Sequence, residues 1–176
     1  MNNNSFVHKY AKGLIKPDDI VVDMTCGNGN DTLFLAKYAK KVIGFDISQE
    51  AINNTKEKTK NFNNVKLIRD NHINIDKYLS GDIKLFIFNL GYLPYSDKNT
   101  TTKKDETLIA FIKAYSLLKI NGYIIITFYR GHLGGKDEYY LLDSYINKEE
   151  INVIEKYCAK EKSDEPITYV IKKLDF

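Results

Sequence analysis

The fold of this chain is decided by VVDMTCGNGNDT, the stretch from Val21 to Thr32. A strand is predicted at Ile20–Met24, ahead of the turn that holds Gly27 and Gly29, and a helix follows at once over Asp31–Lys40. The two glycines let the backbone approach a ligand closely, and the start of the helix offers unpaired N–H groups to a carboxylate or a phosphate. The stretch therefore predicts a strand–turn–helix unit that binds a small molecule.

Further strands and helices alternate along the chain. Strands are predicted at Val42–Phe45, Val65–Arg69, Ile83–Phe88 and Tyr123–Phe128. Helices are predicted from the N-cap Ser48 through Lys60, around Ile75–Leu79, and at Glu106–Lys119 and Lys136–Tyr145. Asn121 and Gly122 are predicted to end the helix at Glu106–Lys119 in a left-handed conformation. Because strand–helix alternation at this spacing gives right-handed crossovers, these strands should form a parallel sheet.

Two closing strands are predicted at Ile151–Cys158 and Ile167–Lys172, joined by a polar stretch without a helix. Such a connection is typical of a hairpin, so the last strand should run antiparallel to the others. The predicted fold class is α/β, a doubly wound, mostly parallel seven-stranded sheet with an antiparallel last strand. It resembles the Rossmann-like class I methyltransferases, although a fold alone does not fix a function. The length predicts one domain over 1–176, with 1–16 as an N-terminal segment or helix.

Composition narrows the function only slightly. The formal charge of +3 permits an anionic partner such as RNA but does not require one, since many enzymes with neutral substrates have the same balance. The two cysteines, Cys26 and Cys158, give neither a disulfide framework nor the ligand spacing of a metal site. Residues 1–16 contain no apolar run suited to a leader or a membrane span. We therefore expect a cytoplasmic protein with no metal and no membrane partner.

A carboxylate follows the glycine turn at a distance typical of nucleoside-binding sites. Asp46 ends the second strand 17 residues after Gly29, near the spacing of about 20 residues at which an acid accepts hydrogen bonds from ribose hydroxyls. A dinucleotide would need a small third residue where Thr32 stands, and Asp23 and Asp31 would repel its pyrophosphate. S-adenosyl-L-methionine carries an ammonium and a sulfonium group, so the same acids favour it. The turn is therefore predicted to bind S-adenosyl-L-methionine.

The third strand ends in the polar sequence RDNH, Arg69 to His72. Asp70 can accept a hydrogen bond from the adenine amino group and Asn71 can add polar contacts, but either residue could equally cap the next helix. Both interpretations stay open. The full set of predicted cofactor contacts is Asp23, Thr25, Gly27, Asn28, Gly29, Asn30, Asp31, Thr32, Asp46, Ile47, Asp70, Asn71, His72 and Asn89.

The fourth strand ends in FNLGYLP, Phe88 to Pro94. In this fold the carboxyl end of that strand lies beside the methyl group that is transferred. Asn89, followed three residues later by Tyr92, matches the spacing of the NPPY loop of methyltransferases that act on amino groups, with Gly91 in place of the second proline. The amide oxygen of Asn89 and a backbone carbonyl can accept the two N–H bonds of an amine. Tyr92 can stack on a planar base.

Four blocks carry a resemblance to a known family: DMTCGNGNDT, GFDI, FNLGYLP with Asp97 and Lys98, and YRGHLGGKDE from Tyr129 to Glu138. Over essentially its whole length the chain is similar to a small bacterial family once labelled rRNA methylases. The resemblance implies dimeric tRNA methyltransferases that convert 5-aminomethyl-(2-thio)uridine at the wobble position to its methylaminomethyl form, with the tRNA anticodon region as partner. Two segments depart from the family pattern, Ile47–Gln49 after the second-strand acid and Ser163–Pro166, so a substrate contact from the latter is in doubt.

The block that begins at Tyr129 follows the fifth strand, so it lies on the same edge as Asn89. His132 could orient the substrate or take the proton of the attacking amine, or it could belong to a structural turn. His8 in the N-terminal segment could close over the site. Predicted catalytic residues are thus Asn89, Tyr92 and His132, and predicted substrate contacts are Leu90, Gly91, Tyr92, Pro94, Lys98, Arg130, Gly131, His132 and Gly134.

Basic residues on the same loops could hold tRNA phosphates, although a solvated basic rim explains them equally well; they are Lys98, Lys103, Lys104, Arg130 and Lys136. The predicted reaction is methyl transfer to a neutral amine, driven mainly by positioning because the sulfonium donor is already activated. Cys26 is interpreted as a small packing residue. The alternatives are methylation of rRNA or of a small amine and, from another class, a nucleotide-binding oxidoreductase or a non-catalytic binding module.

Overall fold

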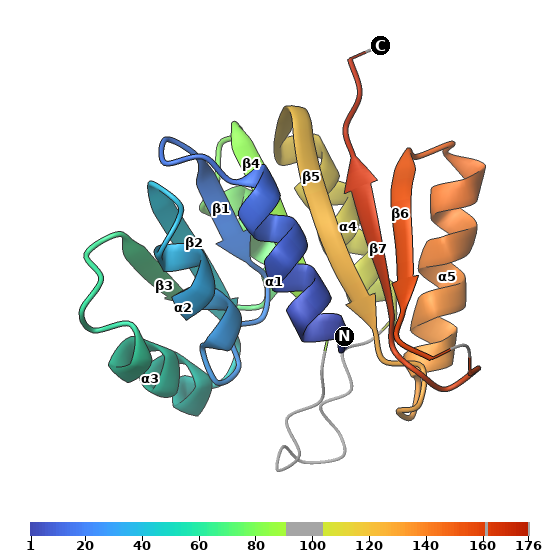
Figure 1. The fold of residues 1–176 in the computed structure, drawn as a ribbon, viewed down its shortest axis with the longest axis horizontal. Helices are drawn as coiled ribbons and strands as arrows, with labels where there is room; N and C mark the ends of the chain where they lie inside the picture. The colour runs from blue at the N-terminus through green and yellow to red at the C-terminus, as the bar shows by residue number, and fades with distance from the viewer. Residues whose placement is uncertain (91–103, 161, 176) are drawn as a thin grey trace.

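Seven strands form one mixed sheet in the order β3-β2-β1-β4-β5-β7-β6 (Figure 1). The computed structural model describes residues 1–90, 104–160 and 162–175. The strands are β1 (Ile20–Asp23), β2 (Lys41–Asp46), β3 (Val65–Arg69), β4 (Ile83–Asn89), β5 (Leu118–Phe128), β6 (Val153–Cys158) and β7 (Ile167–Lys172). β1 to β5 pair in parallel, whereas β7 runs antiparallel to both β5 and β6. The predicted fold class is confirmed, including its antiparallel last strand.

Helices cover both faces of this sheet. They are α1 (Asn3–Leu14), α2 (Asn30–Ala36), α3 (Gln49–Lys58), the 3-10 helix η1 (His72–Lys77), α4 (Lys104–Leu117) and α5 (Gly135–Lys148). Leu85 and Ile87 of β4 pack with α1 and α2, and the alternate residues Phe86 and Phe88 pack with α4 and α5. In Figure 1, α1 crosses in front of the sheet and α4 lies behind it. Within the described ranges, no helix is long and apolar enough to cross a membrane.

The end of α4 differs from its prediction. The helix stops at Leu117, two residues early, because Leu118 already pairs with Ile83 as the first residue of β5. Asn121 does have a positive φ, 59°, but it lies inside β5, where its N–H donates to the carbonyl of Lys173 at 3.0 Å. The prediction that Asn121 and the following glycine end this helix is therefore wrong.

Three other helices start or end close to their predicted limits. α2 ends at Ala36 instead of Lys40, since the backbone turns there toward β2. η1 begins at His72, earlier than the predicted start near Ile75. α3 begins directly after Ser48, whose side chain accepts a hydrogen bond from the first turn of the helix, as its N-cap role predicts.

The strand order reverses between β1 and β4, which is where open α/β sheets bind their ligands. β1 leads to β2 and β3 on one side, and β4 leads to β5 on the other. At this point the N–H of Met24, just after β1, donates to the carbonyl of Ile87 in β4 at 2.9 Å. The glycine turn after β1 and Asn89 at the end of β4 therefore lie together at the carboxyl edge of the sheet.

Candidate functional site

The glycine turn after β1 has a left-handed backbone at both of its glycines. Gly27 and Gly29 have φ values of 51° and 75°. A Cβ on Gly29 would lie 2.9 Å from the Cα of Thr55 in α3, and Gly29 itself places no capping side chain over the start of α2. The N–H groups of the first turn of α2 can therefore bind a ligand carboxylate. Cys26 in this turn is buried and burial raises the pKa of its thiol, which fits a packing role.

Asp46 connects the glycine turn to the end of β2. Its carboxylate accepts hydrogen bonds from the backbone N–H of Gly27 at 3.0 Å and of Ser48 at 2.9 Å. These bonds hold the acid beside the turn, at the place where the sequence predicts a ribose contact. The next residue, Ile47, is 51% exposed, which leaves an apolar surface uncovered beside the acid.

Asp23 lies beneath the turn and is fully buried. One carboxylate oxygen accepts from the N–H of Thr25 at 3.1 Å, and the other accepts from the hydroxyl of Thr32 at 2.6 Å. Burial, followed by the charge of Asp31, raises the pKa of Asp23 to about 7. Asp23 and Thr32 therefore shape the turn from below, and their predicted contact with the cofactor stays a prediction.

Three carboxyl groups lie close together around the turn, those of Asp23, Asp31 and Asp46. Each of the other two acids contributes to the raised pKa of Asp23, so their charges act on one another. Among the described residues, the basic side chain that contacts this cluster is His8, whose Nε2 lies 2.7 Å from Asp31 Oδ1. Such a cluster repels a pyrophosphate and attracts a cation. The site thus has the charge that the sulfonium and ammonium of S-adenosylmethionine require.

The residues after β3 form hydrogen bonds within the chain. The carboxylate of Asp70 accepts from the Tyr78 hydroxyl at 2.7 Å and from the side chain of Asn74 at 2.9 Å. The side chain of Asn71 accepts from the N–H of Ile73 and caps η1. The capping interpretation therefore describes Asn71, while Asp70 remains half-exposed at the edge of the site. Their contact with adenine stays a prediction.

Two buried polar atoms near the turn have no hydrogen-bond partner among the described residues, Thr25 Oγ1 and His72 Nε2. His72 Nδ1 lies 3.2 Å from the carbonyl oxygen of Met24, and burial lowers the pKa of the ring. The neutral ring therefore donates through Nδ1, and Nε2 is an acceptor. Buried polar atoms left unpaired are costly, so these two indicate a ligand group beside them. Together with the acids and the free end of α2, they fit S-adenosylmethionine. Asn28 and Asn30, exposed on the same turn, complete the predicted contacts.

Asn89, the last residue of β4, contacts the first turn of α2, which directly follows the glycine turn. Its Nδ2 donates to Asp31 Oδ2 at 3.0 Å. Its Oδ1 accepts a hydrogen bond from the hydroxyl of Tyr129, one residue after β5, at 2.6 Å. The sequence prediction placed Asn89 here but did not include Tyr129 among the site residues. The alternation of side chains along a strand could have predicted that Tyr129 lies near Asn89. Asn89 pairs with Thr127 in the sheet, and Tyr129, two residues later, lies on the same face as Thr127.

The loop after β5 is tied to the loop between β6 and β7. Arg130 donates to the carbonyls of Glu165 at 3.0 Å and Lys162 at 3.1 Å, and Lys136 forms an ion pair with Asp164 at 2.7 Å. Two of the cations that the sequence assigned to tRNA phosphates, Arg130 and Lys136, thus interact with other residues of this chain. Their phosphate contacts stay predictions.

The rest of that loop lies at the edge of the site. Gly131, His132 and Gly134 are exposed, and the His132 ring centroid lies 5.9 Å from that of Tyr129. Leu90, directly after β4, packs against the core on the α4 side of the sheet. The remaining predicted substrate residues lie outside the described residues; they are Gly91, Tyr92, Pro94 and Lys98.

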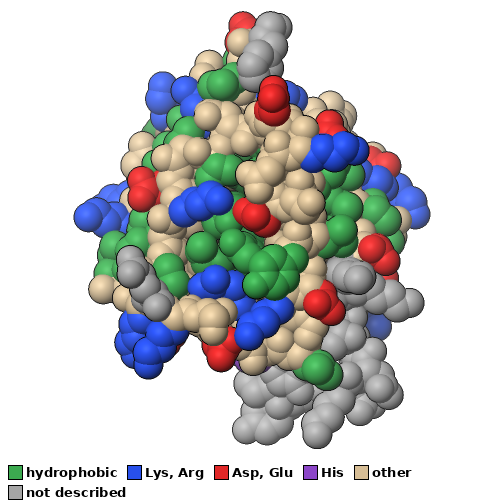
Figure 2. All heavy atoms as spheres, turned by 90° about the vertical axis from the view of Figure 1, so that its right-hand side faces the viewer, with side chains coloured by type: hydrophobic (Ala, Val, Ile, Leu, Met, Phe, Trp, Pro, Cys, Tyr) green, Lys and Arg blue, Asp and Glu red, His purple; other side chains and the backbone are tan. Residues whose placement is uncertain are grey.

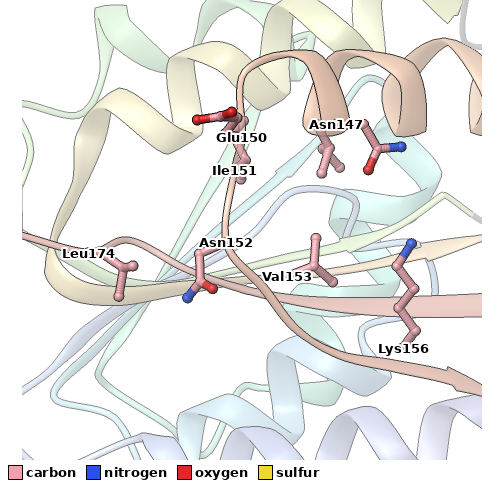
Figure 3. Close-up of a pocket in the computed structure, with 8 residues that line it drawn as sticks. Asn147, Glu150, Ile151, Asn152, Val153, Lys156 and Leu174 are labelled. Atoms are coloured by element: carbon pink, nitrogen blue, oxygen red, sulfur yellow. The ribbon is translucent and has the colours of Figure 1, made fainter.

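A hollow of about 470 Å³ lies elsewhere, where α5 ends and β6 begins (Figure 3). Val153 starts β6 and Leu174 follows the antiparallel β7, so this hollow belongs to the amino edge of the sheet, opposite Asn89. Figure 2 shows the neighbouring face, on which basic, acidic and hydrophobic side chains are mixed.

The sequence from 42 to 172 matches the family model described as "Putative rRNA methylase". The chain belongs to this family. The relative "tRNA (mnm(5)s(2)U34)-methyltransferase, chloroplastic" from Arabidopsis thaliana is 32% identical over an alignment of 154 residues, and the match covers 78% of this chain and 56% of that protein. The chain thus spans little more than half the length of that relative.

Solved structures of similar proteins have the same architecture as this rRNA methylase family member. A "putative rRNA-methylase" from Clostridium thermocellum has 36% identity and a TM-score of 0.90, over 99% of this chain and 98% of that one. A "putative methyltransferase" from Streptococcus mutans, solved in complex with SAH, has 32% identity and a TM-score of 0.88 over 99% of both chains. These findings confirm the predicted methyltransferase fold and identify S-adenosylmethionine as the cofactor.

Proposed function

We propose that this rRNA methylase family member methylates the primary amine of 5-aminomethyl-(2-thio)uridine at the wobble position of tRNA. The observation that carries the proposal is the position of Asn89. This residue ends β4 at the switch point, and its side chain donates a hydrogen bond to Asp31, in the first turn of α2, at 3.0 Å. An amide oxygen there can accept an N–H bond of an amine beside the cofactor. The name of the Arabidopsis relative, a U34 methyltransferase of tRNA, supports this substrate. A homodimer, which the family resemblance implies, and a cytoplasmic location, which the composition predicts, belong to the same proposal.

The chain's own residues act mainly by positioning. When bound, S-adenosylmethionine supplies the methyl group: the amine lone pair forms the N–C bond, the C–S electron pair stays on sulfur, and S-adenosylhomocysteine and a secondary ammonium result. Asn89 Oδ1 accepts an N–H of the amine and so directs its lone pair. The carboxylate of Asp31, next to that amide, stabilises the positive charge that grows on nitrogen. His132 on the exposed loop, or water, takes the proton that the nitrogen releases.

The substrate is tested with two tRNAs that differ in one group. We expect purified protein to transfer a labelled methyl group to tRNA that carries 5-aminomethyluridine at the wobble position, and to leave tRNA with unmodified uridine unlabelled. The physical reason is that only the amine has a nucleophilic lone pair for Asn89 to direct. Nucleoside analysis by mass spectrometry identifies the product. Methylation of the unmodified tRNA, or of rRNA in preference to either, would contradict the amine as the target.

Binding of tRNA should depend strongly on salt. The sequence predicts that scattered basic residues carry the phosphate contacts, and such contacts weaken as salt replaces the released counterions. We expect charge reversal at Lys103 and Lys104 to raise the KM for tRNA and to leave the affinity for S-adenosylmethionine unchanged. Fluorescence anisotropy of labelled tRNA between 50 and 200 mM salt, over which about a thousandfold loss is typical for six phosphate contacts, measures the dependence. An affinity insensitive to salt would point to a small-molecule substrate.

A further inference from the structure

A hydrogen-bonded chain of four side chains crosses the carboxyl edge of the sheet. Tyr129 Oη donates to Asn89 Oδ1 at 2.6 Å, and Asn89 Nδ2 donates to Asp31 Oδ2 at 3.0 Å. The other oxygen of Asp31 lies 2.7 Å from His8 Nε2. The four residues come from the ends of β5 and β4, the first turn of α2, and α1. The tertiary fold alone brings them together.

This chain fixes the direction in which the Asn89 amide faces. A carboxylate can only accept hydrogen bonds, so Asp31 requires the NH2 group of Asn89 on its side. The amide oxygen must then face Tyr129. If the amide turned over, its oxygen would meet the carboxylate of Asp31 and a charge-assisted hydrogen bond would be lost. Asn89 therefore has one preferred orientation.

The hydroxyl of Tyr129 acts as a hydrogen-bond donor to Asn89, and it does not act as a base. Burial, followed by the nearby charge of Asp31, raises the pKa of its hydroxyl above the ordinary value. The hydroxyl therefore keeps its proton at neutral pH. It occupies one of the two lone-pair positions of Asn89 Oδ1, and the other is the position assigned above to the substrate amine.

The opposite end of the chain is anchored by α1. The His8 ring stacks on Phe34 of α2 with centroids 4.0 Å apart and planes 5° from parallel. Near the start of α1, the buried side chain of Asn3 donates to the hydroxyl of Thr168 in β7 at 3.0 Å. Asp31 is thus held between α1 and Asn89. Its negative charge polarises the amide and strengthens Oδ1 as an acceptor.

We infer that Tyr129 is a positioning residue for methyl transfer, because it holds the acceptor group of Asn89 in one orientation while Asp31 and His8 hold the other side of the amide. The inference rests on the proposed function only in naming an amine as the group that is positioned. The orientation of the amide can be measured without any substrate.

The test compares Tyr129→Phe with a matched control, Tyr139→Phe. Both changes remove one hydroxyl, but that of Tyr139 bonds the hydroxyl of Tyr169 at 3.0 Å and does not reach Asn89. We expect Tyr129→Phe to lower the single-turnover rate with amine-bearing tRNA by about ten- to a hundredfold, because a misplaced nucleophile reacts slowly. The KM for tRNA and the Kd for S-adenosylmethionine should change by less than about twofold, as for an interaction made only in the transition state.

A second readout does not depend on activity. The side-chain amide signals of Asn89, identified in a 15N–1H spectrum by their loss in Asn89→Ala, should move in Tyr129→Phe and stay in place in Tyr139→Phe. A wild-type rate for Tyr129→Phe, or unmoved Asn89 signals in that variant, would overturn the inference. If the wild-type protein methylates no amine-bearing tRNA, the proposed function fails instead, and the Asn89 signals alone then decide whether Tyr129 orients the amide.

Discussion

Asn89→Ala is expected to lower single-turnover methylation of tRNA carrying 5-aminomethyluridine by about a hundredfold, since misplacing a nucleophile by about 1 Å has an effect of that order. Asn89 ends β4 at the switch point, and its side-chain oxygen can accept an N–H of the amine there. The glycine turn keeps its backbone conformation and its hydrogen bond to Asp46 in this variant. S-adenosylmethionine should therefore still bind to this variant, which calorimetry measures.

The control for this variant is Asn64→Ala. The Asn64 side chain also makes two hydrogen bonds within the chain, donating to the carbonyls of Ala36 and Ala39 at 2.9 and 2.8 Å, but it precedes β3 at the amino edge of the sheet. The Asn64→Ala protein should be less stable than the wild type, and it should methylate tRNA at the wild-type rate at a temperature where it is folded. Equal losses of rate in the two variants would show that the effect of Asn89 is structural. A wild-type rate for Asn89→Ala would remove it as the acceptor of the amine.

The sheet could be predicted from the sequence because its pattern is local. The apolar run that forms β4 is buried on both faces, and the polar connection before Ile167 gives the hairpin that makes β7 antiparallel. The boundary between α4 and β5 could not be read in the same way. Leu118 has a side chain that suits either element, and its pairing with Ile83, a residue 35 positions earlier, decides between them. Long-range pairing thus overrides the helix-ending signal at Asn121.

The residues of the candidate site also differ in how far the sequence alone could place them. The position of Asn89 and Asp46 follows from strand ends, which the sequence marks, so both could be placed beforehand. The partners of Arg130 could not, because its guanidinium reaches carbonyls more than 30 residues away on the β6–β7 loop. The contact of His8 with Asp31 likewise depends on how α1 packs across α2. Sequence reasoning therefore placed these acids and amides at the ends of their strands, and the fold added the side chains that contact them.

The affinity for S-adenosylmethionine should fall about ten- to a hundredfold in Asp46→Asn. A hydrogen bond to a charged group contributes about 1.5–3 kcal/mol, and each 1.4 kcal/mol is about a factor of ten in Kd. The sequence predicts that the Asp46 carboxylate accepts hydrogen bonds from the ribose hydroxyls, and the loss of its charge would weaken those bonds. Asparagine is preferable to alanine, because alanine would leave the N–H groups of both Gly27 and Ser48 without their acceptor and would loosen the turn.

Asp19→Asn is the matched control for this change. Asp19 is a buried carboxylate that also accepts a backbone N–H, from Lys16 at 2.8 Å, and it forms an ion pair with Lys119 at 2.5 Å, but it lies before β1 at the opposite edge of the sheet. Both variants therefore weaken a buried carboxylate and its backbone contact, so thermal unfolding should show a loss of stability in each. Calorimetry should show weaker cofactor binding in Asp46→Asn alone. An unchanged Kd in folded Asp46→Asn would mean that the acid serves the glycine turn and makes no contact with the ribose.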